Sequence, residues 1–341
     1  MRIIKIASIF AGTVLGAGFA SGQELWIFFG KFKQSGVWGA LISGIMIALF
    51  GGIICSGAKE IDRCDYITYL KSIFFEPVAK VICFVTQVFM FISFSIMISG
   101  SCELMHTQFN IPRLLGGGIT LFICFICLAN KVSGIAKLNI ILTPVMSIGI
   151  FLVSVCYSFM TKEVWNVYNT LESNFFVSAC LYMSYNILSS AAVLATASDI
   201  AKSKMEALIG GFAGGLVLML IMLFSVLALN KAGDMVLNTE FPMLIIAQQL
   251  QDVLKYIYPP LIYMAMLTTA VSSGFCACEF LEKLRFSGRQ AAGILCIASV
   301  PLSMVRFSSL IKNCYILFGV LGIMLIAGIT IKFLKKQGNS R

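Results

Sequence analysis

Charged residues are scarce in this chain. Asp, Glu, Lys and Arg make up 12% of its 341 residues, whereas soluble domains carry roughly 25%. The single histidine, His106, has no metal-ligand partner at a suitable spacing, and no Ser-His-Asp set is evident. The scarcity of these groups argues against an enzyme and against a metal or organic cofactor.

Apolar residues are abundant instead. They make up 59% of the chain, and the mean hydropathy is +0.94. Most of the twelve cysteines lie within apolar stretches, where they act as small apolar residues rather than as a disulfide framework. Segments of about 20 apolar residues recur, and this length crosses a bilayer. The sequence therefore predicts an all-α integral membrane protein, with lipid as its surroundings.

Ten apolar segments predict ten transmembrane helices in one membrane domain, residues 1–341. The predicted spans are 4–29, 36–57, 76–101, 114–130, 136–160, 173–198, 206–229, 258–281, 289–306 and 310–334. Between the seventh and eighth spans, the run 245–257 alternates apolar and polar residues at helical spacing. It predicts an amphipathic helix on the outer surface, either a plain cover or an extracellular lid.

The net charge of +10 reflects the placement of basic residues. Most of the 25 Lys and Arg residues fall at the two termini and in the even-numbered loops. The positive-inside rule then places both termini in the cytoplasm, in a protein of the cytoplasmic membrane. We interpret the basic charge as a signal of orientation and expect no nucleic-acid partner.

The first span is interrupted by four glycines, Gly12, Gly16, Gly18 and Gly22. Each glycine costs roughly 1 kcal/mol relative to alanine inside a helix. In hydrocarbon, a broken helix also leaves backbone groups that find no water. Unwound backbone near the midplane is how secondary transporters build their solute and ion sites. This segment therefore predicts a broken helix with a binding site at the break.

A faint internal repeat organises the chain. The sixth span also interrupts its apolar pattern, at Ser184-Tyr185-Asn186, and glycine-rich spans follow both interrupted ones. Because five is an odd number, a second copy of five spans must insert upside down. The pattern predicts an inverted repeat of five plus five helices, with residues 1–160 as the first copy, 170–335 as the second, and breaks in helices 1 and 6.

These features resemble the leucine-transporter fold of the amino acid–polyamine–organocation superfamily. Within that group, the run Gly-Thr-Val-Leu-Gly-Ala-Gly-Phe-Ala-Ser-Gly-Gln-Glu at 12–24 resembles the YkvI-like bacterial membrane proteins. The resemblance covers nearly the whole chain. It implies a secondary active transporter that works by alternating access, and it leaves the cargo, the direction of transport and the oligomeric state open.

The two interruptions define the expected substrate site. At a break, one half-helix presents free N–H groups and the other free carbonyls, which suits a small zwitterion such as an amino acid. The expected lining residues are Gly16, Ala17, Gly18, Ser21, Gln23, Ser184, Tyr185 and Asn186. The alternative is that the glycines serve close packing and that the polar residues of span 6 only join helices.

Three hydroxyl residues suggest a coupling ion. Thr269, Ser272 and Ser273 stand at i, i+3 and i+4 and share one helix face. In leucine-transporter-fold sodium symporters, this spacing on the eighth span faces carbonyls from the first break. The resemblance thus implies a sodium ion held by these hydroxyls and by the carbonyls of Gly12 and Leu15. No carboxylate lies nearby in sequence, and Ser and Thr are common in membrane helices.

Two alternatives stay open. Some relatives replace sodium with a lysine on the fifth span, but this span has none beyond Lys137. Proton coupling would then fall to Glu24, since a carboxylate within a span is a functional candidate, unless Glu24 lies in an outer vestibule, solvated or paired with Lys31. The rival function is a membrane receptor that binds a solute without moving it, as spore germinant receptors of the same superfamily do. Flux distinguishes the two.

Overall fold

The computed structural model describes residues 1–61, 64–131, 134–160, 174–250 and 252–338, and the regular secondary structure in these ranges is all helical. The side chains of 134–143, including that of Lys137, lie outside the described residues. The helices are α1 (Arg2–Val14), α2 (Ala17–Ser21), α3 (Gln23–Phe28), η1 (Gly30–Phe32), α4 (Lys33–Ala58), α5 (Tyr66–Lys71), α6 (Glu76–Phe109), α7 (Arg113–Ala129), α8 (Gly134–Met160), α9 (Phe175–Ala197), η2 (Ser198–Ile200), α10 (Lys204–Ala232), η3 (Gly233–Val236), α11 (Pro242–Leu250), α12 (Asp252–Lys283), α13 (Gly288–Ser303), α14 (Phe307–Leu310), η4 (Ile311–Tyr315) and α15 (Ile316–Gly338).

Each predicted span coincides with one of these helices or with a consecutive set of them. Among the described residues, six helices are long and apolar enough to cross a membrane, and 113–129 and 144–160 form shorter apolar helices. The chain is therefore a multi-pass membrane protein. Of the amphipathic run 245–257, the part up to Leu250 belongs to α11 and the part from Asp252 to the first turns of α12, while residue 251 lies outside the described residues.

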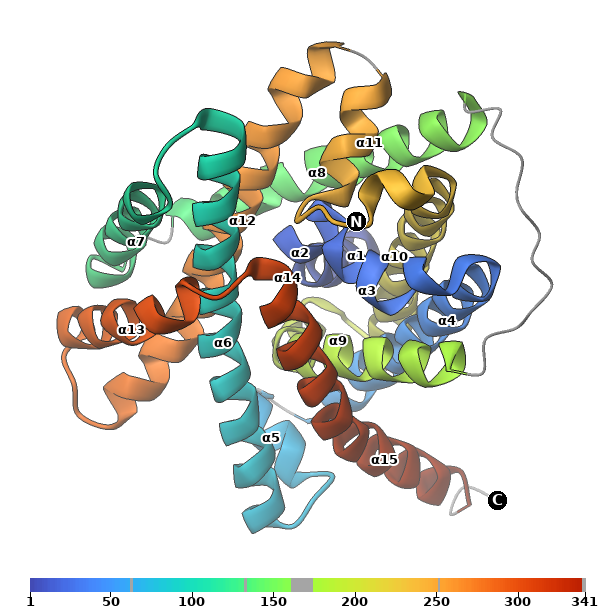
Figure 1. Cartoon of the computed structure of the whole chain (residues 1–341). Helices are drawn as coiled ribbons and strands as arrows, with labels where there is room; N and C mark the ends of the chain where they lie inside the picture. Colours follow the sequence, from blue (N-terminus) through green and yellow to red (C-terminus); the bar gives the residue numbers. More distant parts are fainter. Residues whose placement is uncertain (62–63, 132–133, 161–173, 251, 339–341) are drawn as a thin grey trace.

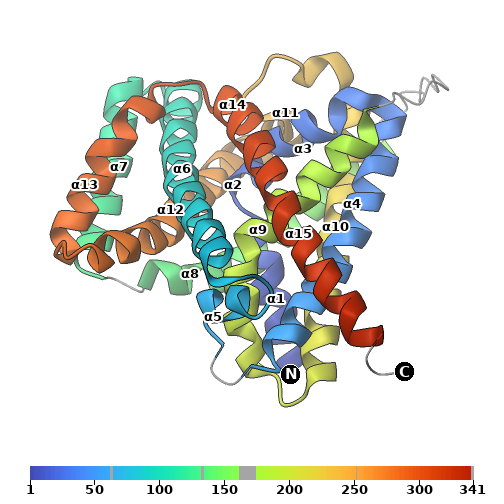
Figure 2. The ribbon, with the colours of Figure 1, turned by 90° about the horizontal axis from the view of Figure 1, so that it is seen from below.

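The helices form two groups (Figure 2). In one group α1, α4, α9 and α10 pack on one another, and in the other α6, α7, α12 and α13 do so, while α15 leans along α9. Small residues allow close approach within the first group, because a Cβ at Gly215 would collide with the backbone of Ala48 in α4. The first turn of α1 and the last turn of α15 lie at the same end of the molecule (Figure 2).

The first span is broken, as predicted, and the structure interrupts it at two points. At Leu15 the backbone forms a tight turn (φ −73°, ψ 62°), in which the Gly16 N–H donates to the Val14 carbonyl at 2.7 Å. These angles are those of an inverse γ-turn. After the five-residue helix α2, Gly22 adopts φ 79°, the left-handed region that favours glycine. The chain then re-enters helix as α3, so α1, α2 and α3 form one interrupted crossing (Figure 1).

The predicted break in the sixth span is wrong. Helix α9 runs without interruption from Phe175 to Ala197, through Ser184, Tyr185 and Asn186. Its polar side chains find acceptors within the same helix: Asn186 Nδ2 donates to the Tyr182 carbonyl at 2.9 Å, and Ser190 Oγ donates to the Asn186 carbonyl at 2.6 Å. A polar run satisfied in this way does not require unwinding.

Candidate functional site

A cavity of about 580 Å³ lies between the two helix groups. Its walls come from the α1–α2 break, from α6, α9 and α12, and from the π-helical turn η4. At one end it reaches Glu24 and Tyr315, and at the other it reaches the exposed residues Ile4 and Lys5 on the first turns of α1. The cavity therefore leads from the interior to the end of the molecule that carries the N-terminus.

The break itself lines the cavity with Gly16, Ala17 and Gly18. Gly18 is required by a close approach, because a Cβ there would run into the carboxylate of Glu24. At Gly16 a Cβ would meet only the side chain of Thr269, at 3.7 Å. The glycines of this segment thus act in two ways: one admits a neighbouring carboxylate, and another borders open space.

Side chains from elsewhere satisfy the backbone groups that the interruptions release. Tyr258 on α12 donates its hydroxyl to the Ala20 carbonyl at 3.1 Å, and Ser178 on α9 donates to the Phe28 carbonyl at 2.6 Å. Ser21 donates to the Gly18 carbonyl at 2.8 Å and accepts from the Gln23 N–H at 3.2 Å. Such partners are what permits broken helices inside a membrane.

Glu24 is the buried carboxylate of the cavity, with 5% of its surface exposed. Its Oε2 accepts a hydrogen bond from the Tyr185 hydroxyl at 2.7 Å. No cationic side chain of the described chain forms an ion pair with it. Glu24 therefore lies in the cavity and not in an outer vestibule, and its hydrogen-bond partner is neutral.

Aromatic rings surround this carboxylate. The rings of Tyr185 and Tyr315 lie 4.8 Å apart, Phe28 lies 5.5 Å from Tyr185, and Phe89 lies 5.8 Å from Tyr315. Tyr315 reaches the cavity from a π-helical turn, a feature that often marks functional sites. Sequence reasoning missed both this turn and Tyr315, since nothing in the run Ile-Lys-Asn-Cys-Tyr at 311–315 signals a π-turn.

Five of the predicted substrate residues line the cavity: Gly16, Ala17, Gly18, Tyr185 and Asn186. Ser21, Gln23 and Ser184 are not among the lining residues. Ser21 is used inside the break, and the buried Oε1 of Gln23 has no hydrogen-bond partner among the described residues. Ser184 donates to the Gly319 carbonyl at 2.6 Å and so joins α9 to α15.

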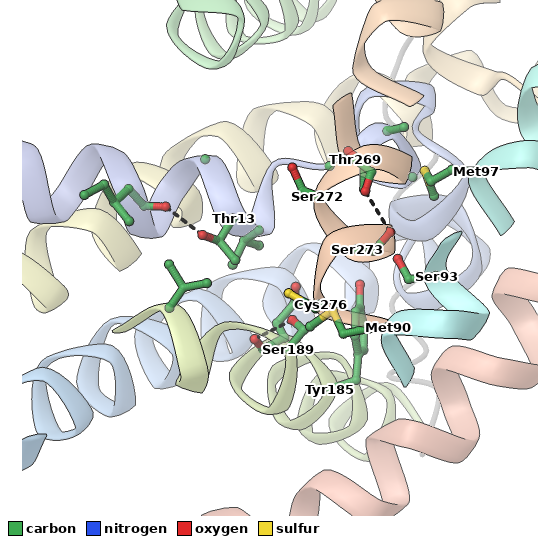
Figure 3. A pocket seen from close by; sticks show the side chains of 18 of the residues that line it. Thr13, Met90, Ser93, Met97, Tyr185, Ser189, Thr269, Ser272, Ser273 and Cys276 are labelled. Atoms are coloured by element: carbon green, nitrogen blue, oxygen red, sulfur yellow. Dashed lines mark hydrogen bonds between the residues drawn. The ribbon is translucent and has the colours of Figure 1, made fainter. Parts of the chain in front are cut away.

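The predicted ion ligands lie mostly at this cavity (Figure 3). Gly12, Thr269, Ser272 and Ser273 line it, whereas Leu15 is buried beside it. Ser273 already donates its hydroxyl within its own helix, to the Thr269 carbonyl at 2.8 Å. The hydroxyl face of α12 thus lies at the cavity beside the α1–α2 break.

The same helix adds a thiol one turn beyond Ser272. Cys276 lies among the lining residues and, of the described cysteines, it is the one that does (Figure 3). The other lining side chains labelled in Figure 3 include Ser93 and Met97 of α6 and Ser189 of α9. Polar groups from three helices therefore converge on one space.

Sequence comparison identifies two similar proteins of Bacillus subtilis (strain 168), and no protein-family model matches the chain. The uncharacterized membrane protein YkvI is 26% identical over 333 residues, which cover 96% of this chain and 95% of YkvI. The uncharacterized protein YyaD is 25% identical over 326 residues, covering 95% and 94% of the two chains.

Solved structures share the fold at low identity. The nucleobase-cation-symport transporter Mhp1, with bromovinylhydantoin bound, aligns with a TM-score of 0.59 at 11% identity, covering 91% of this chain and 74% of Mhp1. MhsT in complex with L-phenylalanine gives a TM-score of 0.59 at 17% identity, with 94% and 80% covered. A manganese transporter of Eremococcus coleocola gives 0.52 at 14%, with 98% and 72% covered. The expected resemblance to YkvI-like membrane proteins with the leucine-transporter fold is confirmed.

Proposed function

We propose that this protein is a secondary active transporter of a small amine-bearing solute. The observation that carries the proposal is the cavity at the α1–α2 break, which combines a buried carboxylate, aromatic rings and hydroxyl groups. Its volume of about 580 Å³ falls within the range of small-molecule sites. The structural neighbours Mhp1, MhsT and the manganese transporter are transporters, and MhsT binds L-phenylalanine, a solute that carries an ammonium group.

Alternating access accounts for the one-sided opening of the cavity. On the side away from Lys5, α11 and the loop before it pack against the break and against α14. Gly22 packs directly on Met243, the rings of Phe241 and Phe307 stack at 5.9 Å, and the Ser308 N–H donates to Glu240 at 2.7 Å. With both termini in the cytoplasm of the cell, this arrangement is the inward-facing one. α11 is then the extracellular lid.

Sodium is the proposed coupling ion, and the inverted repeat of five plus five helices is the proposed frame. In support, the Thr269, Ser272 and Ser273 face lies at the cavity beside the break. Replacing both Ser272 and Ser273 by alanine is expected to abolish sodium-dependent uptake. Sodium dependence that survives this change would discard the assignment of the ion to these hydroxyls. Proton coupling through Glu24 is the alternative, and a Glu24→Gln variant with unaltered pH dependence of uptake would exclude it.

Reconstitution into liposomes tests the function itself. The purified protein should accumulate a radiolabelled amine or amino acid against its gradient when an inward sodium gradient is imposed. A receptor with the same cavity would bind the solute without accumulating it. Saturable binding together with zero flux, in vesicles whose protein orientation has been verified, would contradict transport.

A further inference from the structure

We infer that the solute bound in this cavity is a cationic amine without a carboxylate, with its ammonium group on Glu24. This inference rests on the proposed function, since it names the solute class of the same cavity. It departs from the zwitterion expected from the sequence. That expectation used two broken helices, and α9 is unbroken.

The first reason to expect an amine is the distribution of charge in the cavity. Its described lining has one carboxylate, Glu24, at the closed end, and one cation, Lys5, at the mouth. Lys5 precedes Gly12 by seven residues of helix α1, about 10 Å along the axis at 1.5 Å per residue. A carboxylate bound near the break would thus lie close to Glu24 and far from any lining cation.

The second reason is that the surroundings of Glu24 leave its carboxylate without a positive partner. Among the described residues, the titratable groups that interact with it are tyrosines, Tyr185 and Tyr182 on α9 and Tyr315 on η4, and none of them supplies a positive charge. A buried carboxylate with a neutral hydrogen-bond partner remains poorly compensated. The α2 helix, with five residues, offers little to a second carboxylate. An ammonium ligand supplies the missing charge, and a zwitterion would add a repulsive one.

The third reason is the set of aromatic rings beside Glu24. The rings of Tyr185, Tyr315 and Phe89 lie within 6.5 Å of one another, beside the carboxylate. Aromatic faces attract ammonium groups and pack against flat apolar bodies. The geometry therefore favours an amine on a compact apolar or aromatic body over a long polyamine, whose further charges would find no carboxylate in the described lining.

The experiment compares matched probes that differ only in charge. Phenethylamine, L-phenylalanine and 2-phenylethanol share one body, and isoamylamine, L-leucine and isoamyl alcohol share another. Equilibrium binding to the purified full-length protein is measured by titration calorimetry at neutral pH. We expect each amine to bind at least about tenfold more tightly than its amino acid and its alcohol, and phenethylamine to bind more tightly than isoamylamine.

Two variants that each remove one carboxylate test whether the preference for amines depends on Glu24. Glu24→Gln keeps an acceptor for Tyr185 and should reduce amine affinity by about tenfold or more, with a smaller effect on the alcohols. Glu279→Gln removes a carboxylate from an exposed site outside the cavity lining and should leave amine affinity unchanged. Even where a variant does not fold, the ratios of amine to amino acid and amine to alcohol affinity in the unaltered protein show whether the cavity prefers an amine.

Three results would overturn the inference: amino acids that bind as tightly as their amines, failure of both amines to bind, or an amine preference that persists in Glu24→Gln. The outcome is distinguishable from failure of the proposed function. Accumulation of L-phenylalanine but not of phenethylamine in liposomes refutes the amine class and retains transport. Tight amine binding without flux refutes transport and retains the amine class.

Discussion

Two regions of this molecule carry runs of helix-disfavouring residues, and they behave in opposite ways. The run from Gly12 to Glu24 interrupts its helix twice, whereas the run from Ser184 to Ser190 stays in one helix. Serine and asparagine carry donors that can bond to their own helix, as Asn186 and Ser190 do. Glycine carries no such group, and the broken region also draws donors from other helices: Tyr258 donates to the Ala20 carbonyl and Ser178 to the Phe28 carbonyl. Polarity alone does not open a membrane helix.

The strongest test of this comparison changes the left-handed residue of the broken region. Gly22→Ala adds a Cβ 2.6 Å from Met243 Cγ and 3.1 Å from the Met243 backbone nitrogen, at φ 79°. We expect a loss of about 3 kcal/mol in the free energy of unfolding, from backbone strain and overpacking together. Unfolding in mixed micelles titrated with a denaturing detergent measures it.

Gly233→Ala is the matched control for this substitution. Gly233 also has a positive φ, 51°, but a Cβ there has nothing within 4 Å. Only backbone strain applies, at ψ −123° instead of the −4° of Gly22, so the expected loss is about 2 kcal/mol. Equal losses in the two variants would show that the contact between the break and α11 contributes nothing.

A smaller effect is expected from removing one of the donors that support the break. Tyr258→Phe deletes the bond to the Ala20 carbonyl and should cost about 1 kcal/mol. In Tyr263→Phe the lost partner is Thr120, whose hydroxyl also donates to the Gly116 carbonyl. That variant should therefore lose less stability in the same unfolding assay. The reverse order would contradict the idea that the break depends on donors from outside.

The smallest effects are expected in α9. Ser184→Ala removes a bond that joins α9 to α15, and such contacts average about 0.6 kcal/mol in membranes. Ser190→Ala removes a hydroxyl that bonds only within its own helix in the described contacts, so its unfolding free energy should change by less than about 0.5 kcal/mol. A larger loss in Ser190→Ala than in Ser184→Ala would mean that the serines hold α9 together.

The sequence predicted what depends on local chemistry. The apolar segments located the helices, and the glycines located the break and the cavity beside it. The interruption at Ser184 was misread because sequence shows a polar side chain but not its acceptor, which for Asn186 is four residues back. Tyr315 was missed for a related reason: a π-turn depends on how a helix packs against its neighbours, and the run Ile-Lys-Asn-Cys-Tyr at 311–315 carries no local signal for it.

The thiol of Cys276 gives the cavity a built-in chemical reporter. It lines the space one helical turn from Ser272, and the other described cysteines lie elsewhere. A membrane-impermeant maleimide added to one face of a sealed vesicle reaches this thiol only while the cavity is open to that face. Labelling of Cys276, followed by mass spectrometry of the peptide that contains it, therefore reports to which side of the membrane the cavity is open.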